Sequence, residues 1–387
     1  MGTSLSNSRS LTFYQQTSVK RTDLNASYTG GFTAVPVSHV SHTTAITTTG
    51  YNDQLSGHIT RLNALRAGDA QRYGDSIKAP LKAARDMGVK RAWMYEKADI
   101  EMGGRGSANW NTDEQSQIME HGTVRGAQGH HQQNVSDHPE QQANPDNIKF
   151  YKTQEEHLQE GHGGNWDNES NKPMTDKNEM LKKTNSKRVQ KNEIHGLAVA
   201  VAIGAGVGLT LNIVTTLAQT GISPDTLKYA AIEGVKGAAE GGFLSAASYG
   251  LGHTIGEVAT KAISGVLDKF GVTITENITK MANMGVVGVL SIAVFSTYQF
   301  IKLKIKGVAT KDALLQVGKQ ALFSLSLLAV SIAAQGMWGG AAGLIVSISV
   351  GIIMVSYSVA DSVHQRRFSE KIRVYTIEKC YPSFALT

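Results

Sequence analysis

Apolar positions recur at different spacings along the chain and divide it into stretches of unlike character. Between Asp53 and Met102 they recur at helical intervals, which predicts a helical segment over residues 53–102. Residues 1–52 are rich in Ser, Thr, Asn and Gly with only short apolar runs, so they predict a flexible arm. The stretch from Gly103 to Lys191 is polar and poor in aliphatic side chains, which is typical of a small domain that needs a bound metal besides its core.

Beyond Lys191 the chain becomes apolar over long uncharged stretches, of which Gln320–Ala360 has no charged residue over 41 positions. About 20 apolar residues cross a hydrocarbon layer of about 30 Å. The pattern therefore predicts an all-α domain over residues 194–362 that crosses a membrane four times, the last two spans forming a hairpin. The spans are predicted at residues 194–219, 281–301, 320–335 and 341–360. The alternative is a buried helical bundle in a soluble protein, and the long uncharged hairpin counts against it.

Basic residues flank the predicted spans and indicate their orientation. Lys and Arg gather at residues 182–191, 302–319 and 366–379, and basic residues near the ends of spans stay cytoplasmic. Four spans with both termini inside satisfy all three groups. We therefore predict a protein of the inner (plasma) membrane, with its polar domain and both termini cytoplasmic and residues 220–280 outside.

Charge and cysteine content narrow the candidate chemistry. The net charge is +6, but residues 1–193 contribute +1 and residues 194–387 contribute +5. The basic balance therefore lies in the apolar half and is not by itself the footprint of a nucleic-acid-binding surface. The single cysteine excludes a disulfide framework and a paired-cysteine zinc site. Half of the 12 histidines fall within His121–His162, so a metal site would use them.

The adjacent histidines His130 and His131 suggest a division of roles. Neighbouring residues on a strand point to opposite faces. One imidazole can therefore bind a metal while the other faces a substrate, provided that a local bulge turns the second toward the same cleft. A purely structural zinc site is the alternative, but it would leave one of the two imidazoles without a role.

Two further histidines, His157 and His162, flank the end of a short helical run. A spacing of five residues is about 140° around an ideal helix, so the two share a face only if the helix ends first, for which Gly161 is suited. His157 is the better candidate ligand. His162 is either a second ligand or an orienting group.

Three runs in this region resemble the GHH subgroup of HNH (ββα-metal) nucleases, which are common as toxin modules in bacterial polymorphic toxin systems. The resemblance covers roughly Met102–Trp166. It is carried by the runs GRGSANWNTDEQSQIMEHGTVRGAQGHH, NPDNIKF and EEHLQEGHGGN.

The resemblance implies a β-hairpin, a loop and a helix that together hold one divalent cation. By position, it makes His130 the strand ligand, His131 the general base, Asn147 the loop-fixing residue of the catalytic set and His157 the helix ligand. A neutral imidazole is suited to activating water at cytoplasmic pH, and a cation stabilises the charge that develops at the scissile phosphate. Histidine ligands suit Zn, Ni or Mn, while Mg tolerates a shell poor in histidine, and the sequence does not choose among the four.

The predicted fold is multidomain. A small α+β ββα-metal (HNH) nuclease domain over residues 103–170 is preceded by helices and followed by the all-α transmembrane domain, with a basic polar linker at residues 171–193 and a basic cytoplasmic tail at residues 363–387. The nuclease segment carries scattered basic residues rather than a basic helix, which predicts phosphate contacts with little sequence preference. The candidate DNA-binding residues are Arg105, Arg125, Lys149 and Lys152.

Three functions remain open for this arrangement. The first is a membrane-anchored, metal-dependent endonuclease that cleaves DNA, with a role in defence against incoming DNA. The second is a secreted antibacterial effector whose apolar half inserts into a target membrane for pore formation or self-translocation, because the hairpin and basic tail are similar to the C-terminal end of pore-forming colicins. The third is an inactive nucleic-acid-binding membrane scaffold. The expected partners are DNA, a lipid membrane, and an immunity protein or a second copy of the chain.

Overall fold

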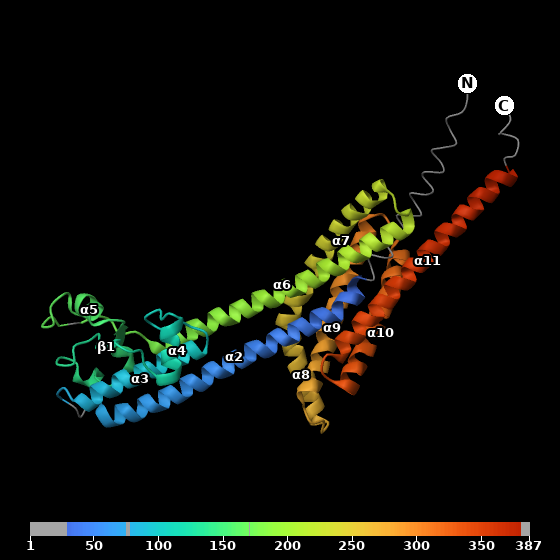
Figure 1. The fold of residues 1–387 in the computed structure, drawn as a ribbon. Helices are drawn as coiled ribbons and strands as arrows, with labels where there is room; N and C mark the ends of the chain where they lie inside the picture. Colours follow the sequence, from blue (N-terminus) through green and yellow to red (C-terminus); the bar gives the residue numbers. More distant parts are fainter. Residues whose placement is uncertain (1–28, 75–77, 170, 381–387) are drawn as a thin grey trace. The chain divides into compact units, whose positions relative to one another are not determined.

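The computed structural model describes residues 29–74, 78–169 and 171–380 (Figure 1). These residues form two compact units, one made of residues 46–193 and the other of the described residues before 46 and after 193. Two long helices, α2 (Thr29–Tyr73) and α6 (Lys177–Thr220), contribute a segment to each unit.

The unit of residues 46–193 builds a two-stranded antiparallel sheet among helices. Strand β1 pairs with β2 so that Gln128 lies opposite Tyr151 and His131 lies opposite Ile148, with no interruption in the register. Its elements are α3 (Lys82–Glu101), α4 (Thr112–His121), β1 (Gln128–His131), the 3-10 turns η1 (Pro139–Gln141) and η2 (Pro145–Asn147), β2 (Ile148–Tyr151), α5 (Gln154–Glu156) and the π-helical turn η3 (His157–Gly161).

Aromatic side chains fix one face of this sheet against α3. The ring of Trp93 on α3 lies 3.9 Å from the ring of Phe150 and 5.5 Å from that of Trp110, measured between centroids. Residues opposite each other in the pair share a face, so Gly129, which lies opposite Phe150, is on this side too. A Cβ on Gly129 would lie 3.0 Å from the side chain of Val89. The pair His131 and Ile148 shares this face, and the other face carries Gln128, His130, Lys149 and Tyr151.

The start of α6 is docked in this unit, which corrects the predicted linker at residues 171–193. Leu181 is fully buried in a cluster with Leu62 and Tyr95. The ammonium of Lys177 lies 3.1 Å from Glu96 Oε1, and both side chains are buried. A run of Lys and Asn looks like a linker by composition, but it is helical from Lys177 because one side of the helix finds these partners.

Helix α2 corrects the flexible arm predicted over residues 1–52. The chain is helical from Thr29, and residues 1–28 lie outside the described part. Small polar side chains such as Thr33, Ser38 and Ser41 are buried in the unit of residues 29–45 and 194–380. Ser38 Oγ donates to the carbonyl of Val35 within its own helix. Packing therefore outweighs the low helical propensity of the Ser- and Thr-rich sequence.

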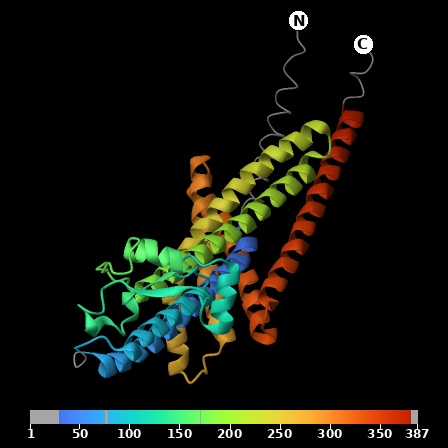
Figure 2. The same ribbon diagram turned by 60° about the vertical axis from the view of Figure 1, so that its left-hand side comes forward.

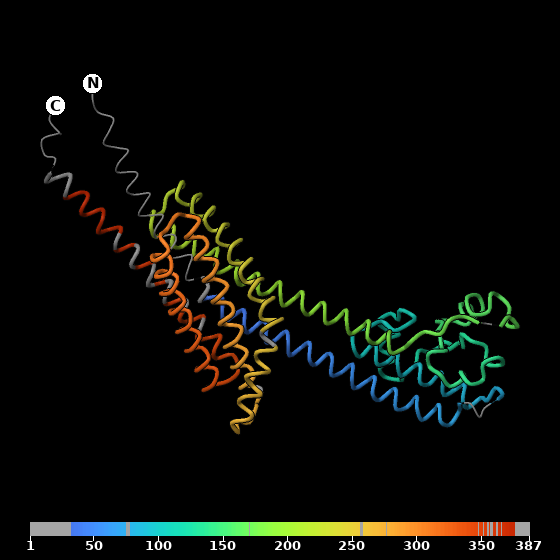
Figure 3. Tube along the Cα trace, turned by 180° about the vertical axis from the view of Figure 1, so that it is seen from behind, coloured from blue at the N-terminus to red at the C-terminus, as the bar shows by residue number. Residues whose placement is uncertain are grey.

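The second unit is helical throughout its described elements. After α6 it contains α7 (Pro224–Leu251), the π-helical turn η4 (Gly252–Gly256), α8 (Glu257–Lys269), α9 (Glu276–Ile305), α10 (Thr310–Trp338) and α11 (Ala342–Cys380). Figure 2 shows α6 and α7 side by side, and they approach closely because Gly208 faces the backbone of Gly237. Helix α10 contacts both α9 and α11, as Figure 3 shows.

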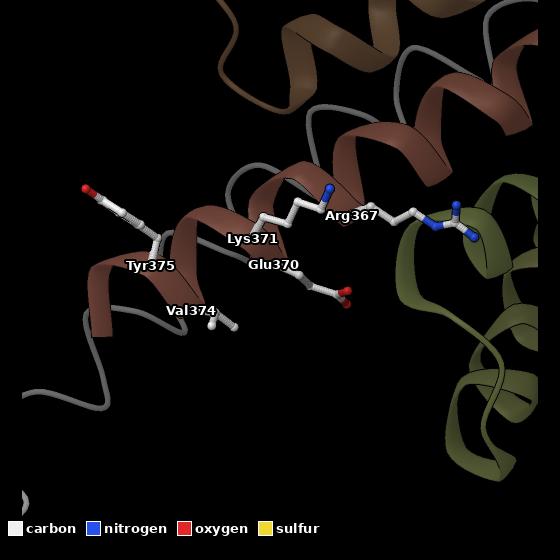
Figure 4. Close-up of a pocket in the computed structure, with 5 residues that line it drawn as sticks. All are labelled: Arg367, Glu370, Lys371, Val374 and Tyr375. Carbon is white, nitrogen blue, oxygen red and sulfur yellow. The ribbon is translucent and has the colours of Figure 1, made fainter. Parts of the chain in front are cut away.

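Among the described residues, three helices are long and apolar enough to cross a membrane: Lys177–Thr220, Asn277–Ile305 and Thr310–Trp338. They contain the first three predicted spans. The hairpin predicted for the last two spans forms as α10 and α11. The fourth span stays a prediction, since several side chains of α11 lie outside the described part. The predicted tail is helical as far as Cys380, and Figure 4 shows its exposed side chains, from Arg367 to Tyr375.

This unit exposes many large apolar side chains, unlike a water-soluble bundle. Leu322, Val330 and Ile348, for example, are at least half exposed. Its interior holds apolar side chains such as Leu328, and also small or polar ones such as Ser331 and Gln335. An exposed apolar surface of this kind needs an apolar surrounding to be stable.

Truncating the buried acid should destabilise the unit of residues 46–193. Glu96→Ala leaves the Lys177 ammonium buried without its partner, and we expect a loss of about 3–5 kcal/mol in the free energy of unfolding. Urea unfolding followed by the fluorescence of the buried tryptophans measures it. The control is Asp86→Ala, which removes an exposed ion pair with Lys82 and should cost about 1 kcal/mol or less. Equal effects of the two changes would contradict the prediction.

Candidate metal centre

Three histidines converge on the face of the sheet that is turned away from α3. A nitrogen of each of His130, His157 and His162 lies within 4.8 Å of a nitrogen of the others. The His130 ring is 4.9 Å from the His157 ring and 4.8 Å from the His162 ring. The three residues come from β1, from η3 and from the residue that follows η3. They could hold a metal ion.

A π-helical turn brings the two later histidines together despite their five-residue spacing. The turn runs from His157 to Gly161, and its hydrogen bonds join residues five apart, so one turn separates His157 from His162. Their ring centroids are 5.0 Å apart. A Cβ on Gly161 would lie 2.8 Å from the His157 ring, which explains the glycine. The helix ends at Gly161, as expected, with His162 as its C-cap, and the local widening of its last turn also brings the two rings together.

Hydrogen bonds fix the orientation of two of these imidazoles. Nδ1 of His162 lies 3.0 Å from the carbonyl oxygen of Asn168, which can only accept, so this nitrogen carries the proton. Nδ1 of His157 lies 2.7 Å from Gln128 Oε1 and donates in the same way. Each ring therefore donates with Nδ1 and leaves Nε2 as the nitrogen that could bind a metal, the arrangement found in many metal-binding histidines.

His130 completes the donor set. Its Nδ1 lies 2.9 Å from His157 Nε2, while its Nε2 is buried and has no hydrogen-bond partner among the described residues. Burial, together with the neighbouring His157 and His162, lowers the pKa of His130 to about 3, so this ring is neutral at physiological pH. A buried, unpartnered imidazole nitrogen beside two further imidazoles fits a divalent cation of the Zn, Ni or Mn type.

Asn147 ties together the loop between the two strands. Its side chain is fully buried. Oδ1 accepts from the backbone N–H of Gln133 at 2.7 Å, and Nδ2 donates to the carbonyls of Gln133 and Gln141. These bonds connect the start of the loop to its end, and they are the contacts expected of a loop-fixing residue.

His131 lies on the opposite face of the sheet from His130. It is opposite Ile148, a core residue, and the continuous register contains no bulge. The predicted bulge that would turn both imidazoles toward one cleft is therefore wrong. Nε2 of His131 lies 3.0 Å from the carbonyl of Gln142 and donates to it. Burial lowers the pKa of His131, so the ring is neutral with an unprotonated Nδ1.

The four predicted DNA-binding residues fall into two groups. Arg105 and Arg125 are exposed. Lys149 is 3.4 Å from a carboxylate oxygen of Glu160 and lies over the ring of Tyr151, and Lys152 is 2.7 Å from a carboxylate oxygen of Glu114. By strand register, Lys149 shares the face of His130. The lysines are thus held by ion pairs, whereas the arginines extend into solvent.

Sequence reasoning missed three side chains around the histidines. Gln128 orients His157, Tyr151 stacks on its ring at 5.4 Å, and the ring of Trp166 lies 5.2 Å from it. Gln128 is two residues before His130 on the same strand, so the alternation of strand faces could have identified it. The place of Trp166 depends on a loop whose path the sequence does not reveal.

The comparison with protein families agrees with this geometry. Residues 78–152 match the family described as a GHH-signature-containing HNH/Endo VII superfamily nuclease toxin. The match confirms the resemblance of this segment to GHH nucleases, and it begins before residue 102, so it includes α3. It covers His130, His131 and Asn147 and ends before His157. No curated protein and no solved structure matches the chain.

Removing the side chain that orients His157 should weaken metal binding. We expect Gln128→Ala to lower the affinity for Zn²⁺ by about 10–100-fold, since the imidazole loses its hydrogen-bond acceptor. Calorimetric titration of the chelator-treated protein measures this affinity. The matched control is Gln159→Ala, at an exposed position of η3, which should bind as the wild type does. Unchanged affinity in Gln128→Ala would show that the hydrogen bond does not support a metal ligand.

Proposed function

We propose that residues 46–193 form a metal-dependent nuclease that acts as a toxin. The observation that carries this proposal is the convergence of His130, His157 and His162 at a segment that matches a nuclease toxin family. One divalent cation held by these residues would stabilise negative charge at the scissile phosphate. Asn147 holds the loop that joins the two strands, so the strand that carries His130 keeps its position.

The general base in this proposal is His131. Its Nε2–H is held by the carbonyl of Gln142, which leaves Nδ1 to accept a proton from water. Burial keeps the ring neutral at physiological pH. His130 and His131 face opposite sides of the sheet, and His131 is the last residue of β1. Both side chains can therefore reach one substrate only if its backbone crosses the end of this strand.

The proposed substrate is DNA, recognised through its phosphates. Arg105 and Arg125 are exposed and can meet phosphates directly. Lys149 and Lys152 would exchange their carboxylate partners for phosphate oxygens when DNA binds. Contacts of this kind carry little sequence preference and weaken as salt rises.

Replacing the proposed base should separate catalysis from metal binding. We expect His131→Ala to reduce plasmid nicking by about 100-fold or more, as for loss of a general base, with metal affinity within a few-fold of the wild type. His130→Ala and His157→Ala should lose metal and activity together. Nicking gels and calorimetry on the same preparations measure both. Full activity of His131→Ala would exclude it as the base, and absence of cleavage by the wild type with any metal would favour the inactive scaffold.

We propose that the helical unit after residue 193 enters a lipid bilayer. Its exposed large apolar side chains and its buried serines and glutamines support this proposal, as does the presence of three described helices of sufficient length and apolarity.

The similarity of the nuclease segment to a toxin family favours an effector that inserts into a target membrane over a role in defence. Such a toxin needs an immunity protein in the cell that makes it. Stable anchoring in the producer's inner membrane, with both termini cytoplasmic, is the second candidate.

A charge placed on the exposed apolar surface should impair insertion. Leu322 on α10 is 67% exposed, and an arginine in the centre of a span costs about 2.5–3.5 kcal/mol on insertion scales. We expect Leu322→Arg to lower the membrane fraction in vesicle flotation far more than Leu227→Arg, which changes an exposed leucine on α7. Equal flotation of the two variants would count against a bilayer around α10. Fractionation of the producing cell separates the two candidates, since only an anchored nuclease is membrane-bound there.

A further inference from the structure

Trp166 presents a large aromatic surface beside the three histidines. Its side chain is 45% exposed. The ring lies 5.2 Å from that of His157 in an edge-on arrangement and 5.1 Å from that of His162. The two other tryptophans of this unit, Trp93 and Trp110, are buried in the core. An exposed indole at a polar site loses apolar burial unless a ligand covers it.

Hydrogen bonds and two glycines fix the conformation of the loop that carries Trp166. Gly163 and Gly164 have φ values of 60° and 85°, which side-chain-bearing residues rarely adopt, and they reverse the chain directly after His162. The carbonyl of His162 accepts from Asn168 Nδ2 at 2.7 Å, and Nδ1 of His162 donates to the carbonyl of Asn168. These two bonds close the loop on both sides of Trp166. The indole is thus positioned by the same residue that we assign to the metal.

Basic groups lie near the histidines that Trp166 contacts. The ammonium of Lys172 is 2.5 Å from the carbonyl of Glu160 and contributes to the lowered pKa of His130. Lys149 is on the same face of the sheet as His130. A nucleic-acid strand that passes these lysines would bring its phosphates to the histidines and its bases toward Trp166. Aromatic rings next to basic side chains are the combination that binds unpaired bases, because every base has a π-face to stack.

We propose that Trp166 stacks on an unpaired base next to the phosphate to be cleaved, so that the site prefers single-stranded nucleic acid, or unpaired loops and ends, over duplex. This inference rests on the proposed nuclease function and adds its substrate class. A base within a duplex is already stacked on both sides and cannot offer a free face to the indole. An unpaired base offers one without first breaking a pair.

The test measures binding without cleavage, on the full chain in detergent with a chelator present. The probes are a short single-stranded oligothymidine and a duplex of the same length, and the readouts are anisotropy of labelled DNA and quenching of tryptophan fluorescence.

We expect tighter binding of the single strand. Trp166→Leu should weaken it by about tenfold or more without changing duplex binding, as for loss of one stacked base. Trp166→Phe should retain most of the affinity. The control Trp338→Phe, at an exposed tryptophan of the other unit, should behave as the wild type.

Other outcomes overturn the inference in distinguishable ways. Equal weakening of single-strand and duplex binding in Trp166→Leu would make the indole a general contact. Unchanged binding with reduced Zn²⁺ affinity would mean that the indole only positions His157 and His162. If the wild type nicks both probes equally when metal is supplied, the strand preference fails while the nuclease stands. If it cleaves neither probe yet binds the single strand through Trp166, the nuclease proposal fails and the stacking site stands.

Discussion

The buried ion pair of Glu96 and Lys177 is the interaction on which the unit of residues 46–193 depends. Glu96 accepts from Lys177, from the indole N–H of Trp110 and from Ser107, through both its oxygens. These donors come from α6 and from the segment before α4, whereas Glu96 is on α3. One carboxylate therefore joins three parts of the chain, and its neighbour Trp93 in turn supports the sheet that bears the histidines. Burial makes these bonds strong, and it makes the loss of any partner costly.

The sequence predicts the helices and the convergence of the histidines better than it predicts the chain around them. Helical spacing predicts α3, and the clustering of histidines in the sequence includes the three that converge and could hold a metal ion. A turn of π-helix cannot be read from residue spacing, because the geometry that places His162 depends on packing around Gly161. The same limit explains the arm and the linker. Residues 29–52 and 177–193 are polar in composition, yet they are helical because buried partners elsewhere in the chain stabilise them.

The two units differ in where their large apolar side chains lie. Around Trp93 and Phe150 the apolar side chains are inside, as in a soluble domain. Beyond residue 193, glycines allow close backbone contacts, as between Gly204 and Gly241, while many large apolar side chains are exposed. Such close contact of small residues is how helices associate where lipid offers no hydrophobic drive. One chain thus combines a core suited to water with a surface suited to lipid.

The π-helical turn at His157 bears on how such metal centres can change during evolution. A turn of this kind holds one residue more than a turn of α-helix. Deleting one residue between His157 and His162 would give a spacing of four, which places two side chains on one face of a regular α-helix. A change between these two spacings, by insertion or deletion of one residue, can therefore occur here while both histidines stay on one face of the helix. Chains with either spacing can be variants of one centre, although their sequence patterns no longer align across it.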